Sequence, residues 1–409
     1  MIKRVSQLMA LIAVWMTLPV LGHAEPMRVG FTGPFDGPNA YLGEEISRGI
    51  ELGLMHINAH KSLNYDVTLV PMNDSYEPAR TAEAITALVE EYDIKAMLGS
   101  VGTPTAVATL PLLKHYNVPL IAPLTGAKYL YSERAKGTIF NVRASYEDEV
   151  FLLVEKLVEN LNIHSEDIAI LAQKDAYGES GLNSLLNALK YHGIKHPEQA
   201  LQIRYARNSP FAEHAAADIL SHKKLPKIVF IIGTYEVASQ LISILDEMDI
   251  SPLYATLSAA GIGALADRTQ HTKAMILFTQ STPPLSHNYL PLIKEFLTDS
   301  ANFMPEDTPT NLKLEGYISA RILGLILSEF HREHIPTSKS LSVSMNRVGS
   351  FDLGAGFKLA LQSTDTPNHK TIWLRLISGG QVQDVSQNSE LLYNNESADL
   401  ANSEGHDYD

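Results

Sequence analysis

The sequence contains no cysteine, and this absence removes several kinds of chemistry at once. Without a thiol the chain can form no disulfide, no thiolate nucleophile and no zinc site with sulfur ligands, and it has no cysteine to carry a lipid. Positive charge is also scarce, because the chain has 32 Lys and Arg but 46 Asp and Glu, which gives a net charge of −14. Such an acidic chain is a poor partner for nucleic acid or for an anionic membrane surface.

Long hydrophobic runs are absent beyond the N-terminal region. There, Lys3 and Arg4 precede an apolar stretch from Leu8 to Leu21, which is shorter than the roughly 20 apolar residues that span a bilayer. Small residues follow at the spacing of a cleavage site, so we predict a signal peptide over residues 1–24, cut after Ala24. Its removal would take the net charge to −16. We expect an exported protein in the periplasm of a two-membrane bacterium, with no direct membrane insertion.

Motifs of catalysis and of cofactor binding are missing as well. The glycines at residues 99–102 are not followed by the Lys-Ser or Lys-Thr pair of a P-loop and lack the GxGxxG spacing. The stretch Gly178–Gly181 fails the GxSxG spacing of a nucleophile elbow, and we interpret Ser180 as a helix cap. His56 and His60 share a predicted helix but have no evident third ligand, so we interpret them as solvated. We therefore predict no catalytic residue, no metal and no cofactor.

The stretch from Ala96 to Ala127 has the pattern strand, turn, helix, strand, turn, which is one βαβ unit. Thr103 suits the N-cap of its helix, and the proline after it suits the first helical position. The helix would then direct the free amides of Thr105 and Ala106, and the positive end of its dipole, at the carboxyl edge of the sheet. This arrangement predicts a site for an anionic or strongly polar group.

The second strand of this unit ends at the same edge of the sheet. We therefore expect Leu124, Thr125 and Gly126 to offer backbone groups beside the helix start. Together the two turns are interpreted as half of a small-molecule site.

Strand and helix patterns alternate along the rest of the chain, and 409 residues are enough to bury two cores. This alternation favours an α/β fold of two doubly wound, Rossmann-like lobes. The predicted strands cover residues 27–31, 65–71, 96–98, 118–122, 139–143, 168–172, 199–205, 227–232, 274–279, 357–361 and 372–377. Predicted helices include residues 42–57, a helix from Pro78, and 149–161, 180–191, 211–222, 236–248, 289–297 and 314–330.

The last third of the chain is interpreted as completing both lobes rather than as a third domain. Residues 25–143 with 280–349 are predicted to form the N-terminal lobe, and residues 144–279 with 350–385 the C-terminal lobe. Residues 386–409 hold six acids and no Lys or Arg, which predicts a disordered acidic tail.

The order of these motifs resembles the type I periplasmic binding proteins, in the leucine/isoleucine/valine-binding branch, over Met27 to about Val385. The resemblance rests on the segments VGFTGPF, YLGEEISRGIELGLMHIN, MNDSYEPARTAEA, GSVGTPTA, APLTGAKYL and QKDAYGESGL, and on FDLGAGFKLALQSTDTPNH near the end. It implies two lobes joined by three crossovers, a small-molecule ligand in the cleft between them, and an inner-membrane ABC permease as partner.

The resemblance also implies roles for residues of the first lobe. Thr103 matches a hydroxyl residue that holds the ligand's carboxylate. Leu124 and Gly126 match positions that give a backbone group and a second hydroxyl; since glycine has no hydroxyl, we expect Thr125 to substitute. Tyr41 lies near the gate on the first lobe.

In the second lobe, Tyr177 and Tyr235 match aromatic residues that close over the ligand, and each follows a predicted strand directly. The chain departs from the amino-acid binders at Leu257–Gly261, which contains no acid to pair with a ligand's α-ammonium. An unpaired buried ammonium is costly, so leucine-type ligands are disfavoured.

The sequence therefore predicts the substrate-binding protein of an ABC importer, for a small polar or carboxylate-bearing solute such as an amino acid, an amide or a related compound. A ligand-binding subunit of a sensory or chemotaxis system is the alternative, since it would use the same two lobes. An enzyme is disfavoured because no base, nucleophile and oxyanion hole assemble.

Overall fold

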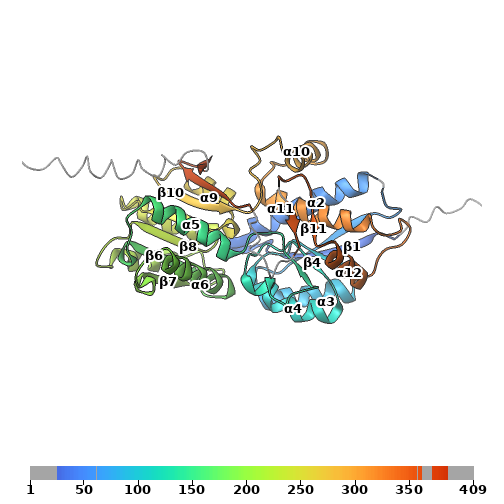
Figure 1. Ribbon diagram of the computed structural model, residues 1–409, viewed down its shortest axis with the longest axis horizontal. Helices are drawn as coiled ribbons and strands as arrows, with labels where there is room; N and C mark the ends of the chain where they lie inside the picture. Colours follow the sequence, from blue (N-terminus) through green and yellow to red (C-terminus); the bar gives the residue numbers. More distant parts are fainter. Residues whose placement is uncertain (1–24, 61, 357, 362–370, 386–409) are drawn as a thin grey trace, which may run out of the picture.

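The computed structural model describes residues 25–60, 62–356, 358–361 and 371–385. These residues form two α/β lobes that lie side by side (Figure 1), which confirms the predicted fold class. The predicted signal peptide, residues 1–24, and the predicted acidic tail, residues 386–409, lie outside the described residues.

The first lobe is built on a parallel sheet with the strand order β2-β1-β3-β4-β5. Alternate residues of its strands face two helical layers: Met97 and Leu120 pack against α3 and α4, whereas Leu98 and Ile121 pack on the side of α2 and α11. The strands are β1 (Met27–Gly33), β2 (Val67–Asn73), β3 (Met97–Leu98), β4 (Leu120–Ile121) and β5 (Ile139–Phe140). The helices are α2 (Ala40–Ala59), α3 (Pro78–Glu90), α4 (Thr103–Tyr116), α10 (Pro291–Phe303), α11 (Asn311–Leu327) and α12 (Ser338–Val348).

Helices α2 and α11 pack with their backbones in contact. A Cβ on Gly49 would overlap the Lys313 carbonyl, and one on Gly316 would overlap the Ile46 carbonyl. Only glycine permits so close an approach. It fixes α2 and α11 as one layer on the first sheet.

The second lobe has a mixed sheet with the order β14-β13-β10-β9-β8-β6-β7, parallel from β10 to β7. All residues of β6 and β8 are buried, as expected for parallel strands covered on both faces. The strands are β6 (Ile168–Gln173), β7 (Leu201–Tyr205), β8 (Ile228–Ile232), β9 (Leu253–Thr256), β10 (Met275–Gln280), β13 (Trp373–Ser378) and β14 (Gln381–Asp384). The helices are α5 (Tyr146–Asn160), α6 (Ala176–Tyr191), α7 (Glu213–Leu220), α8 (Tyr235–Glu247) and α9 (Ile262–Thr269).

Two of the predicted crossovers are described, at residues 141–145 and 281–290, while most of the third lies outside the described residues. The small sheet of β11 (Ser350–Phe351) and β12 (Leu359–Ala360) was assigned to the second lobe from the sequence. Its contacts lie with the first lobe: Leu359 lines a pocket with Ala122 and Val142, and the Leu292 amide of α10 donates to the Gly354 carbonyl between the two strands.

Several elements differ from the sequence predictions. Strand β9, helices α9 and α12, and strands β11 and β14 were not predicted, and β9 occupies a central place in the second sheet. Helix α6 begins at Ala176 with Asp175 as its N-cap, so the interpretation of Ser180 as the cap is wrong. His56 is buried and its Nδ1 lies 2.7 Å from an Asp299 oxygen, so it is not solvated; His60 is exposed.

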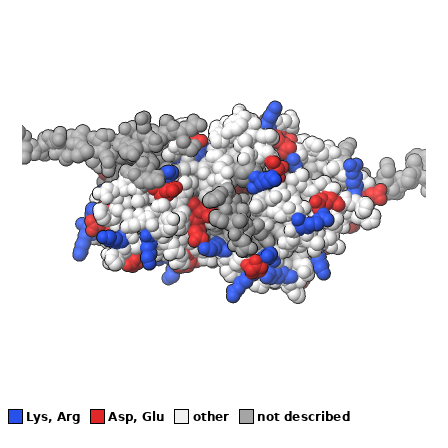
Figure 2. All heavy atoms as spheres, in the orientation of Figure 1, with Lys and Arg blue, Asp and Glu red and all other residues white. Residues whose placement is uncertain are grey.

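Among the described residues, no helix combines the length and apolar character needed to cross a bilayer. Lys and Arg are interspersed with Asp and Glu over the face shown in Figure 2.

Candidate functional site

The two sheets present their carboxyl ends to each other. In the first sheet the strand order reverses between β1 and β3, and in the second between β6 and β8. Ligands in open α/β sheets bind beyond the carboxyl ends of strands at such reversals. A small cavity with about 10 Å³ of free volume lies there, lined by residues of both lobes, namely Leu42, Tyr76, Val101, Gly102, Thr103, Leu124, Tyr146, Tyr177, Thr234 and Ala259.

Thr103 is the best-placed predicted residue. Its Oγ1 lies 2.7 Å from Oγ1 of Thr125 and 3.3 Å from the hydroxyl of Tyr146. The residue begins helix α4, and its predicted N-cap role is wrong because Gly102 is the N-cap, with a φ of 103°. A left-handed glycine there turns the chain so that the Thr103 side chain faces the cavity instead of the helix amides.

Thr105 and Leu124 are placed differently from the prediction. The Thr105 hydroxyl donates to the carbonyls of Val101 and Gly102 and so is turned back toward its own loop. Leu124 lines the cavity, but its amide donates to Ser100 O and its carbonyl accepts from Gly102 N. The backbone of Leu124 is therefore already paired within the sheet edge.

Thr125 and Gly126 lie one layer behind Thr103. Thr125 shares a hydrogen bond with Thr103 and also accepts one from Ala127 N at 3.3 Å. Gly126 accepts from Tyr146 N at 2.8 Å, and a Cβ there would lie 2.7 Å from Ala144 O. Since no side chain fits at residue 126, Thr125 is the hydroxyl that the fold can supply.

Three tyrosines surround the cavity from both lobes. Tyr146 and Tyr177 have ring centroids 5.3 Å apart, and the Tyr177 hydroxyl donates to Gly233 O at 3.5 Å. Burial raises the pKa of both hydroxyls and of the Tyr76 hydroxyl, so all three remain protonated donors near neutral pH. Tyr177 lies in the first turn of α6 rather than in a loop.

Tyr41 and Tyr235 meet outside the cavity. Their rings are edge to face with centroids 5.7 Å apart, and they join the start of α2 to the start of α8 across the two lobes. The Arg268 guanidinium lies 4.9 Å from the centroid of the Tyr235 ring. Tyr235 is the first residue of α8 and is not part of the cavity lining, although it was predicted to close over the ligand. The residue before it, Thr234, lines the cavity.

Tyr76 is a cavity residue that sequence reasoning missed. It and Ser75 have φ values of 60° and 49°, which are unusual for residues with side chains and for a bulky one especially. Asp74 accepts hydrogen bonds from Tyr76 N at 2.8 Å and from the Thr81 hydroxyl at 2.9 Å, and these bonds hold the turn. A Cβ on Gly102 would overlap the Tyr76 ring, so this turn presses Tyr76 onto the start of α4.

Asp74 makes stability depend on pH. Its side chain is fully buried, and burial raises its pKa from 3.8 to about 6 despite the hydrogen bonds it accepts. Since the folded protein holds this proton more tightly than the unfolded chain, the stabilisation is complete below about pH 4 and is lost as pH rises through 6. Asp74→Asn should therefore gain stability over the wild type between pH 4 and 7, by about 3 kcal/mol.

Urea unfolding of both proteins at several pH values measures this difference. Asn can keep both contacts, because its oxygen can accept from Tyr76 N and its amide can donate to Thr81. Asp218→Asn, at an exposed position on α7, is the control. Its free energy of unfolding should vary with pH as that of the wild type does. A constant gap between Asp74→Asn and the wild type over this range would contradict the prediction.

A buried charge network lies beneath the cavity and was also missed. Glu149, in the first turn of α5, accepts from the amide and hydroxyl of Ser258 at 2.9 and 2.8 Å and from the Thr279 hydroxyl at 2.5 Å. Arg143, on the first crossover, pairs with Glu315 of α11 and donates to the Ser258 hydroxyl. A carboxylate thus lies directly behind residues 257–261, where the sequence itself has none.

Comparisons with known proteins identify the fold and the family. The structure of a possible leucine/isoleucine/valine-binding protein from Rhodopirellula baltica SH 1 matches with a TM-score of 0.81 and 31% identity, covering 90% of this chain and 98% of that one. A solute-binding protein from R. palustris in complex with benzoate has the same fold at 17% identity, with a TM-score of 0.72 over 88% of this chain and 95% of that one.

Relatives in Brucella are more distant in sequence. Leu/Ile/Val-binding protein homolog 7 of Brucella abortus is 22% identical over 81% of this chain and 84% of its own length. Homolog 3 of Brucella melitensis is also 22% identical, but the match spans 53% of this chain and only 56% of that relative.

The family model described as periplasmic binding protein matches residues 26–381, which is most of the chain. Proteins of this family and fold bind solutes and are not enzymes. The chain belongs to the periplasmic binding protein family, in its leucine/isoleucine/valine-binding-like branch.

Proposed function

We propose that this protein captures a small carboxylate-bearing solute between its lobes and delivers it to an ABC permease in the inner membrane. The observation that carries the proposal is the cavity at the start of α4, where the Thr103 hydroxyl is backed by Thr125 and Tyr146. Hydroxyl donors at the positive end of a helix suit an anionic group.

The rest of the lining indicates an uncharged body for the solute. Leu42, Val101 and Leu124 supply an apolar wall, and the tyrosines supply ring faces and protonated hydroxyls. No residue of the cavity lining carries a charge. A carboxylate would therefore meet hydroxyl donors at one end and apolar surface along its body.

An α-ammonium on the solute is disfavoured by the same lining. Glu149 is the nearest acid to residues 257–261 that we identify, and its carboxylate is already engaged by Ser258 and Thr279. A carboxylic acid without an amino group is thus the solute class that the cavity supports best.

Periplasmic placement is part of the proposal. It is supported by the family and by the predicted signal peptide over residues 1–24. The sensory alternative would use the same cavity, and no contact in the described residues favours it.

A thermal-shift screen of the mature chain from Glu25 tests the solute class. The protein is refolded first to remove any solute carried through purification, and it is then mixed with simple carboxylic acids, branched-chain amino acids and neutral amides. A ligand at 100 times its Kd adds about 2.7 kcal/mol of stability, which raises the Tm measurably. We expect hits among acids that lack an amino group. Hits confined to leucine and its relatives would show that Ser258 and Glu149 receive an ammonium, and hits confined to amides would exclude a carboxylate head.

A further inference from the structure

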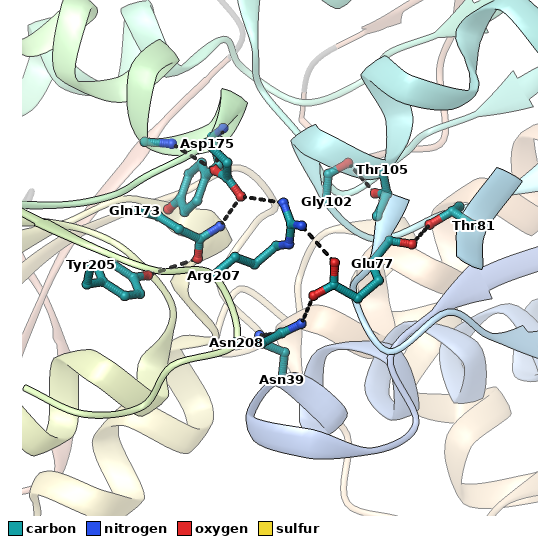
Figure 3. Close-up of polar contacts among 12 residues, drawn as sticks. Asn39, Glu77, Thr81, Gly102, Thr105, Gln173, Asp175, Tyr205, Arg207 and Asn208 are labelled. Carbon is teal, nitrogen blue, oxygen red and sulfur yellow. Dashed lines mark hydrogen bonds and ion pairs between the residues drawn. The ribbon is translucent and has the colours of Figure 1, made fainter. Parts of the chain in front are cut away.

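The two lobes are joined outside the cavity by a polar contact centred on Arg207. This residue lies in the loop after β7 of the second lobe. Its Nη2 donates to a Glu77 oxygen of the first lobe at 2.7 Å, and its Nη1 donates to an Asp175 oxygen of its own lobe at 3.2 Å. Figure 3 shows the guanidinium lying between the two carboxylates. One cation thus bridges acids from opposite sides of the cleft.

The neighbouring residue, Asn208, adds to the same contact. Its amide donates to Ser75 O at 3.0 Å and to the other Glu77 oxygen at 2.7 Å. Its own oxygen accepts from the Asn39 amide at 2.9 Å (Figure 3). Asn208 has a φ of 58°, a left-handed conformation that asparagine tolerates better than most residues. The loop therefore reaches three residues of the first lobe.

The two acids are held in place by their own lobes. Asp175 is the N-cap of α6, accepts from Tyr177 N at 3.0 Å and receives the Gln173 amide at 2.7 Å. Glu77 occupies the N-cap position of α3. The side chain of Arg207 is 22% exposed, that of Asp175 is 9% exposed and that of Glu77 is 41% exposed, so the guanidinium and Asp175 are sheltered from water and Glu77 is open to it. A guanidinium that is partly buried and held by a fixed carboxylate makes stronger charge-assisted hydrogen bonds than a fully exposed one.

The contacts that Arg207 and Asn208 make with the first lobe involve no residue of the cavity lining, so they favour closure of the lobes whatever the cavity holds. They are nonetheless linked to it along the chain. Tyr76, which lines the cavity, precedes Glu77, and Tyr177, which also lines it, is two residues beyond Asp175. The turn that holds Tyr76 over α4 is thus the turn that presents Glu77 to Arg207.

We propose that Arg207 and Asn208, with Glu77 and Asp175, form a latch that sets the balance between open and closed lobes independently of the solute. The role of Arg207 is to position the two lobes rather than to bind the solute. The latch acts on the closure that the proposed function requires, and so it rests on that function. Its test, however, needs neither a solute nor the permease. A negative solute screen would therefore not contradict the latch, and a negative result for the latch would not contradict the proposed solute class.

The distance between the lobes in the full mature chain measures the latch directly. Because the protein has no cysteine, cysteines introduced at Lys114 on α4 and Asn187 on α6 would be the only labelling sites, and both positions are exposed. Spin labels or a fluorophore pair then report the ratio of open to closed molecules. We expect Arg207→Gln to raise this ratio roughly fivefold, and 1 M NaCl to raise it in the wild type by screening the pair.

Two further variants separate a latch from a general loss of structure. Glu77→Gln should shift the ratio as Arg207→Gln does, and the double variant should shift it by less than the product of the two, because both remove one interaction. Arg204→Gln is the matched control, since Arg204 pairs with Glu179 inside the second lobe. The proposal is overturned if Arg207→Gln leaves the ratio unchanged, if Arg204→Gln shifts it equally, or if the wild type is already fully open.

Discussion

Replacing Arg143 with methionine is expected to lower the free energy of unfolding by about 3–5 kcal/mol. The Arg143 side chain is 2% exposed and pairs with Glu315, and it also donates to Ser258. Methionine fills most of the volume but leaves Glu315 and Glu149 buried without their cation. A buried charge that loses its partner is far more costly than an exposed one. Urea unfolding of the wild type and Arg143→Met at pH 7 measures the loss.

The loss should depend on pH in a definite direction. Burial already raises the pKa of Glu315 above its usual value, and the nearby Arg143 opposes that rise. Without the arginine the pKa of Glu315 in the folded protein rises further. A raised carboxyl pKa gives stability that is complete below the unfolded value of 4.5 and is lost as pH rises through the folded value. Arg143→Met should therefore be closer to the wild type at pH 5 than at pH 8.

Two other variants test the cause of the loss. Adding Glu315→Leu to Arg143→Met removes one orphaned carboxylate and should recover much of the stability, since a buried ion pair can often be replaced by apolar groups. Arg48→Met, at a side chain that is 51% exposed, should change stability by only about 0.5 kcal/mol. If the double variant were no more stable than Arg143→Met, packing rather than charge would explain the loss.

The architecture could be predicted from sequence because its signals are local. Short apolar runs such as Ile168–Gln173 and Ile228–Ile232 are buried on both faces and alternate with amphipathic helices, so each element is visible in its own residues. Strand β9 was missed because it has only four residues and follows a proline. Its strand conformation is set by β8 and β10, which flank it, rather than by its own pattern.

The candidate site was predictable only in part. Sequence patterns indicate which residues lie at a sheet edge, but not the direction in which each side chain points. Thr103 and Leu124 were expected to lie near each other because parallel strands end at one edge, whereas Tyr177, from the other lobe, was expected over the ligand because of the family resemblance; all three line the cavity. The direction of a hydroxyl is a finer matter: Thr103 and Thr105 are two residues apart, yet one faces the cavity and the other its own loop. That difference follows from the left-handed Gly102, which the sequence does not reveal.

Contacts between distant segments could not be predicted at all. Glu149 reaches Ser258 across 109 residues, and Arg207 reaches Glu77 across 130. Glu149 stands in none of the quoted motifs, and Glu77 lies in the segment MNDSYEPARTAEA without an assigned role. Both lie at the start of a helix, where acids are common because of the helix dipole, so neither is marked as functional by its position. Sequence reasoning therefore predicted residues that line the cavity but not the charges that lie behind it and beside it.

Thr103→Val is expected to weaken binding of a carboxylate solute by about tenfold to a hundredfold, the usual effect of removing a hydrogen bond to a charged group. Valine has the shape of threonine, so the cavity keeps its volume and loses only the hydroxyl that Thr125 and Tyr146 support. Isothermal titration with the acid found in the screen gives the Kd, and urea unfolding shows whether the variant is folded. A neutral amide of the same acid should lose less, because its hydrogen bond carries no charge.

Thr105→Val is the matched control for this experiment. It removes a hydroxyl from the same helix turn, but one that donates to Val101 and Gly102 rather than facing the cavity. We expect it to lower stability while the Kd stays within about twofold of the wild type, since only an interaction made with the solute changes affinity directly. Loss of affinity in both variants would mean that the start of α4 as a whole, and not the Thr103 hydroxyl, receives the solute. An unchanged Kd in Thr103→Val would place the carboxylate elsewhere in the cavity.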